Sequence, residues 1–84
     1  MRIEEQIRKH LEDNKLFADE IRLYDDAVEV DISWGDWKHE HLRCNFLMSE
    51  LGCENWGEAT TEEDGSDCYS ATHVYKLPSK WRVQ

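Results

Sequence analysis

The chain has 84 residues, a hydrophobic content of 39%, a charged content of 35% and a formal net charge of −9. This length suits one small domain and excludes two, so residues 1–84 are predicted to fold as a single unit with a thin core. Nine aromatic residues, four of them tryptophan, provide enough apolar area to exclude an intrinsically disordered chain.

The acidic excess is concentrated in two blocks. Residues 18–36 contain seven acidic side chains and one basic side chain, and residues 53–68 contain six acidic side chains and no basic one. Phosphate groups are bound by lysine and arginine, so we expect neither direct binding to nucleic acid nor binding to an anionic membrane. The chain also contains no apolar run long enough to span a membrane, and its start does not resemble a signal peptide. With three cysteines expected to be free thiols, these features favour a cytoplasmic protein.

The first half predicts a helix followed by a β-hairpin. An isoleucine or leucine recurs at every fourth position near the start, which favours a helix over residues 3–14. Over residues 19–33 apolar and polar side chains alternate instead, most clearly from Val28 to Ile32, as in a strand with one buried face. The pair Asp25-Asp26 interrupts this alternation and predicts the turn of the hairpin.

The second half predicts the same order of elements. Helical spacing returns over residues 36–51, and Gly52 is well suited to end this helix. Residues 53–77 are rich in threonine, tyrosine, valine and tryptophan, which favours a second hairpin. The faces of its first strand cannot be assigned from the pattern. Residues 78–84 form a short basic tail, in which Trp81 is expected to fold back onto the body of the domain.

The elements together predict an α+β fold of order αββαββ. We expect a four-stranded, mainly antiparallel sheet with both helices packed on one face. The opposite face of the sheet would then be open to solvent or used for binding.

Histidine and cysteine residues raise the possibility of a metal site. His41 and Cys44 are three residues apart on the second predicted helix, so their side chains can converge, whereas His39 points away from His41. A zinc ion would need further ligands, from Cys53, Cys68 or His73. The spacing lacks the close pairs typical of small zinc domains. A small metal-binding domain built on His41, Cys44 and Cys53 is therefore an alternative, and the main expectation is that the protein binds no cofactor.

Catalytic motifs are absent from the sequence. It contains no nucleophile elbow, no glycine-rich phosphate loop and no zinc-protease motif. Paired carboxylates are common in so acidic a chain and do not indicate acid–base chemistry by themselves. We therefore expect a protein without catalytic activity.

The acidic hairpins are the main functional candidates. Clustered carboxylates with tryptophan and tyrosine nearby are suited to a basic protein partner, because aromatic groups contribute binding energy and charges contribute steering. The predicted partner-binding residues are Asp25, Asp26, Glu29, Asp31, Trp56, Glu58, Glu62, Glu63 and Asp64. The leading hypothesis is an interaction protein for a basic, nucleic-acid-handling partner, such as an inhibitor or an antitoxin-like factor. Carboxylates that only maintain solubility are the simpler interpretation, and self-association through the open sheet face, giving a homo-oligomer, is a further alternative.

Overall fold

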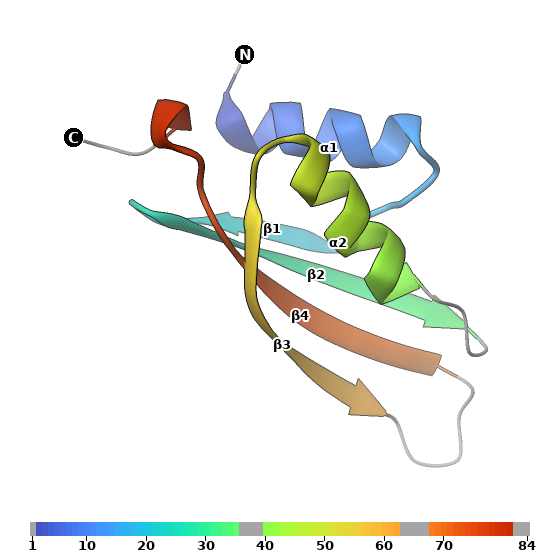
Figure 1. Cartoon of the computed structure of the whole chain (residues 1–84). Coiled ribbons are helices and arrows are strands. Elements are labelled where there is room, and N and C mark those ends of the chain that lie inside the picture. The colour runs from blue at the N-terminus through green and yellow to red at the C-terminus, as the bar shows by residue number, and fades with distance from the viewer. Residues whose placement is uncertain (1, 36–39, 63–67, 82–84) are drawn as a thin grey trace.

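The computed structural model describes residues 2–35, 40–62 and 68–81. Within these ranges the side chains of residues 34–35, 40–41, 58–62 and 68–69 are not described. The described residues form two helices, four strands and a short 3₁₀ turn in the predicted α-β-β-α-β-β order (Figure 1). The elements are α1 (Ile3–Asp13), β1 (Glu20–Leu23), β2 (Ala27–Gly35), α2 (Glu40–Glu50), β3 (Glu54–Glu62), β4 (Cys68–Lys76) and η1 (Ser79–Trp81).

The four strands form one antiparallel sheet, and both helices cover the same face of it (Figure 1). The strand order is β1-β2-β4-β3, so the two hairpins meet at the centre of the sheet, where β2 pairs with β4. This arrangement confirms the predicted α+β fold. The beginning of the second helix, predicted at residue 36, lies outside the described residues.

The core lies between the helices and the sheet. Alternation along β2 and β4 sends every second side chain toward the helices, as the sequence predicted, and the two helices contribute one apolar stripe each. Trp81 packs against this core, which confirms the expected return of the tail. The fully buried side chains include Ile7, Leu11, Val28, Val30, Cys44, Met48, His73 and Tyr75.

Both helices end in the same hydrogen-bonded motif. At the end of α2, the amide of Cys53 donates to the Met48 carbonyl and the amide of Gly52 donates to Ser49, with Gly52 at a φ of 85°. At the end of α1, the amides of Leu16 and Lys15 donate to Leu11 and Glu12, and Lys15 has a φ of 65°. These are two Schellman caps, which place an apolar residue of the following loop against the last turn of the helix. Each helix has 11 residues, and none in the described part of the chain is long and apolar enough to cross a membrane.

An irregularity in β3 explains why its faces could not be assigned from the sequence. Asn55 pairs with Tyr75 and Gly57 pairs with Val74, so Trp56 is an extra residue between two adjacent pairs. Such a β-bulge shifts the alternation by one position. The side chains before and after Trp56 therefore do not follow one continuous period of two.

Candidate functional site

The sheet face opposite the helices carries a polar cluster on β1, β2 and β4. Because Val28, Val30 and Ile32 point into the core, the alternate β2 side chains Glu29 and Asp31 lie on the helix-free face. Strand pairing places Arg22 opposite Glu29, Glu20 opposite Asp31, and Asp31 opposite Thr72. We call this group, Glu20, Arg22, Glu29, Asp31 and Thr72, the Arg22 cluster.

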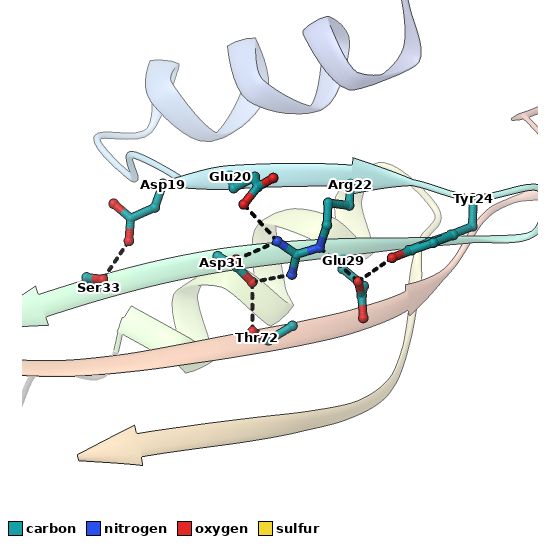
Figure 2. Close-up of polar contacts among 8 residues, drawn as sticks. All are labelled: Asp19, Glu20, Arg22, Tyr24, Glu29, Asp31, Ser33 and Thr72. Atoms are coloured by element: carbon teal, nitrogen blue, oxygen red, sulfur yellow. Dashed lines mark hydrogen bonds and ion pairs between the residues drawn. The ribbon is translucent and has the colours of Figure 1, made fainter. Parts of the chain in front are cut away.

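Arg22 contacts three carboxylates at once (Figure 2). Its Nη1 and Nη2 atoms donate to the two Asp31 carboxylate oxygens at 2.7 and 2.8 Å. Its Nε donates to Glu29 at 3.0 Å, and Nη1 also donates to Glu20 at 2.9 Å. The Arg22–Asp31 contact is a two-point pairing of a planar guanidinium with a carboxylate, which fixes orientation as well as charge.

Three hydroxyl groups extend the network along the sheet (Figure 2). Thr72 donates to Asp31 Oδ1 at 2.7 Å, which connects β4 to the cluster. Tyr24, which follows β1 at the turn of the first hairpin, donates to Glu29 at 2.7 Å. Ser33 donates to Asp19 beside the start of β1. Four carboxylates, those of Asp19, Glu20, Glu29 and Asp31, are therefore held in defined positions by hydrogen bonds that connect β1, β2 and β4.

These contacts lower the pKa values of two carboxyl groups and raise those of Tyr24 and Arg22. Hydrogen bonds from Arg22, assisted by one from Thr72, lower the pKa of Asp31. The hydrogen bond from Tyr24, followed by that from Arg22, lowers the pKa of Glu29, and the same Tyr24–Glu29 contact raises the pKa of Tyr24. The guanidinium pKa of Arg22 is raised, chiefly by its hydrogen bond to Asp31. These shifts favour the ionised carboxylates of Asp31 and Glu29 and the protonated guanidinium of Arg22.

A hollow lies next to the cluster on the same face. Its volume is about 250 Å³, and the carboxylate residues Asp19, Glu20 and Asp31 line it together with Ser70 and Thr72. The lining combines negative charge with hydroxyl groups. These groups can accept hydrogen bonds from a cationic side chain such as lysine or arginine.

The structure separates the predicted partner-binding residues into distinct groups. Asp25, Asp26 and Trp56 are exposed, as a contact surface requires. Glu29 and Asp31 are half-buried, with 27% of each side chain exposed, and both are bound by Arg22. The remaining predicted residues, Glu58, Glu62, Glu63 and Asp64, lie outside the part whose side chains are described.

The organising role of Arg22 was missed in the sequence, although a signal for it exists. Arg22 is the only basic residue among residues 18–36. A turn at Asp25-Asp26 makes Leu23 the partner of Val28, and antiparallel pairing then places Arg22 opposite Glu29. The contribution of Thr72 required knowledge of the β2–β4 register, which the sequence does not provide.

The described residues provide little for a metal site. Cys44 and Cys53 are buried thiols, and burial raises the pKa of Cys53 to about 11, which disfavours the thiolate that binds zinc. The Tyr75 hydroxyl lies 3.2 Å from Cys44 Sγ and donates to Asn45 Oδ1 at 2.7 Å. Residues whose side chains are described include no group of three or more His, Cys, Asp or Glu side chains that could hold a metal. The His41 side chain lies outside that set, so the metal site on His41, Cys44 and Cys53 stays a prediction.

Comparison with known proteins adds no assignment. No protein-family model, no curated protein and no solved structure matches this chain.

Proposed function

We propose that this chain is a non-catalytic interaction protein that binds a basic segment of a protein partner through its helix-free sheet face and the adjoining β1–β2 turn. The supporting observation is the charge of the first hairpin. Residues 19–33 contain six carboxylates and one basic residue, Arg22. Even after Arg22 is paired, this hairpin retains a large negative excess, which attracts and orients a cationic partner.

The Arg22 cluster makes this face rigid before any partner arrives. Carboxylates that are already positioned lose less side-chain entropy on binding than freely rotating ones, and Arg22 positions those of Glu20, Glu29 and Asp31 in this way. In this proposal Glu29 and Asp31 have an organising role, because Arg22 occupies much of their hydrogen-bonding capacity. Asp25 and Asp26 at the turn, and Glu20 beside the hollow, provide the carboxylates that contact the partner.

Two exposed aromatic side chains, Tyr24 in the first hairpin and Trp56 on β3, are available for contact with a partner. Tyr24 and Trp56 are each 51% exposed, and Tyr24 donates to Glu29 of the cluster. Lys76 lies 6.0 Å from the Trp56 ring, in cation–π geometry. Tyrosine and tryptophan frequently contribute much of the energy of protein interfaces. Proteins that handle nucleic acid expose basic surfaces for phosphate, so an inhibitor or antitoxin-like factor for such a protein is the specific form of this proposal.

Affinity capture with matched charge variants tests the proposal. The wild-type chain, immobilised and incubated with host-cell lysate at low salt, is expected to retain a basic protein and to release it at high salt, because salt screens exposed charges. The double variant Asp25→Lys/Asp26→Lys should lose this partner. The double variant Glu5→Lys/Asp13→Lys makes the same change in net charge on exposed positions of α1, and it should retain the partner.

Two results would contradict the proposed function. One is that no basic protein is retained at low salt. The other is that the turn variant and the α1 variant weaken capture equally, which would mean that total charge, and not the first hairpin, is responsible. Circular dichroism of both variants verifies that each is folded before the comparison is made.

A further inference from the structure

A second surface, on the opposite side of the molecule, remains unexplained by the proposed function. Helix α2 directs Cys44 and Met48 into the core and leaves Leu42 and Phe46 exposed on its outer side, at 54% and 64%. The two residues are one turn apart, so they form a continuous apolar patch. We call Leu42 and Phe46 the α2 strip.

The α2 strip borders a hollow that a large side chain could enter. The hollow has a volume of about 390 Å³ and is lined by Asn14, Leu42, Arg43, Phe46 and Leu47. Its α2 members are two consecutive pairs separated by one turn, and Asn14 at the end of α1 also lines it, so the hollow lies between the two helices. The exposed Phe46 ring therefore lies at the edge of this hollow.

We propose that the α2 strip is a self-association surface, on which a second copy of this chain docks its own α2 in antiparallel orientation about Phe46. In this arrangement Phe46 of each copy lies near the twofold axis and enters the hollow of the other. The contact is isologous, because the same patch is used on both sides.

Charge complementarity supports a second copy as the occupant. Arg43 precedes Phe46 by three residues and Glu50 follows it by four, and the seven-residue interval puts both on the same flank of the helix. An antiparallel twofold pairing about Phe46 therefore places Arg43 of one copy beside Glu50 of the other, twice. In the single chain Arg43 donates to the Asn14 carbonyl and Glu50 contacts His10 at 3.2 Å. A guanidinium carries five N–H donors and a carboxylate has two oxygens, so these contacts are compatible with an additional ion pair.

The distribution of charge also favours this side for contact between two copies. Two chains of net charge −9 repel each other, most strongly where the acidic hairpins would meet. By contrast, residues 1–17 contain four acidic and four basic residues, and residues 37–52 contain two of each. The two sequence segments that contain the helices are therefore balanced in formal charge, unlike the acidic hairpins. Because the strip offers only two large apolar side chains per copy, the dimer is expected to be reversible and to require high protein concentration.

Sedimentation velocity over a range from micromolar to millimolar chain tests the proposal. The wild-type chain is expected to shift from monomer to dimer as its concentration rises, and Phe46→Glu should remain monomeric. Phe46 is exposed, so the variant should keep the wild-type circular dichroism spectrum. The dimer should persist at high salt, unlike the capture of a basic partner through the opposite face, so the two proposals can fail separately.

A cysteine crosslink tests the antiparallel geometry. Phe46→Cys brings two cysteines together at the twofold axis, and mild oxidation should give a disulfide-linked dimer on a non-reducing gel. Phe17→Cys is the matched control, because Phe17 is 62% exposed and lies outside the α2 strip. The wild-type chain, oxidised in the same way, shows how much crosslinking its own cysteines cause. A chain that stays monomeric at millimolar concentration, a dimer that survives Phe46→Glu, or equal crosslinking at positions 46 and 17 would each overturn the proposal.

Discussion

Replacing Asp31 with asparagine tests whether charge holds the Arg22 cluster together. The asparagine oxygen could still accept the hydrogen bond from Thr72. Its amide N–H groups, however, would face the N–H groups of Arg22, and two donors cannot form a hydrogen bond with each other. Hydrogen bonds to charged groups contribute about 1.5–3 kcal/mol. Since 27% of the Asp31 side chain is exposed, solvent screening reduces the expected loss to roughly 1–2 kcal/mol. For a domain of this size, that loss lowers the melting temperature by about 5–10 °C.

The pH dependence of this loss provides the decisive measurement. The pKa of Asp31 in the folded chain lies below its ordinary value of 3.8, because Arg22 hydrogen-bonds to the ionised form. The stabilisation is therefore present when the pH is above the ordinary pKa of the carboxyl group. It is lost as the pH falls through the lower pKa of Asp31 in the folded chain. Urea unfolding gives the free energy of unfolding of wild type and of Asp31→Asn. The two values should differ by the full loss of roughly 1–2 kcal/mol at neutral pH, and this difference should become smaller as the pH falls.

A matched control uses Asp26→Asn in the exposed turn, which should change the free energy of unfolding by less than about 0.5 kcal/mol. The reasoning is refuted if Asp31→Asn is as mild as this control at neutral pH. It is also refuted if the difference in free energy of unfolding between wild type and Asp31→Asn stays constant as the carboxylate of folded Asp31 is protonated. A contact that depends on charge must weaken when the carboxylate takes up a proton.

Four further predictions concern the helix ends and the core. Lys15 and Gly52 both occupy a left-handed backbone conformation, which glycine adopts at lower cost than other residues. Lys15→Gly should therefore raise the free energy of unfolding by about 0.5–1 kcal/mol, and Gly52→Ala should lower it by about 1 kcal/mol. Urea denaturation measures both changes. Tyr75→Phe should lower stability by about 1–2 kcal/mol, because the buried hydroxyl bonded to Asn45 is removed, and thermal melting followed by circular dichroism measures this loss. Cys53 should react slowly with a maleimide at neutral pH and rapidly after unfolding, because its pKa is raised to about 11; peptide mass spectrometry monitors the labelling.

The elements with a clear period were predictable from the sequence. The alternation from Val28 to Ile32 identified the buried face of β2, and those side chains are buried in the structure. The turn at Asp25-Asp26 and the glycine cap of α2 at Gly52 were likewise recognisable, because each depends on local backbone chemistry. The resulting order of helices and hairpins led to the correct fold class.

Features that depend on register or on an exception to local preference were not predictable in the same way. The bulge at Trp56 removes the period of two that a strand prediction relies on. The cap of α1 uses Lys15 where glycine is the usual residue, so it has no compositional signal. The contact between Thr72 and Asp31 joins strands from different hairpins, and its prediction would have required the sheet order.

The central pairing of β2 with β4 has a consequence for how the chain reaches its native state. This pairing extends over nine residues and joins Ala27 to Lys76 at one end and Gly35 to Cys68 at the other. Neither helix–hairpin half contains both central strands, so neither can complete the sheet alone. Long-range pairing of this kind makes folding slower than helix formation and requires both halves at once. If the backbone were cut after Gly35, the two fragments would be expected to fold only when mixed, each providing the central strand that the other lacks.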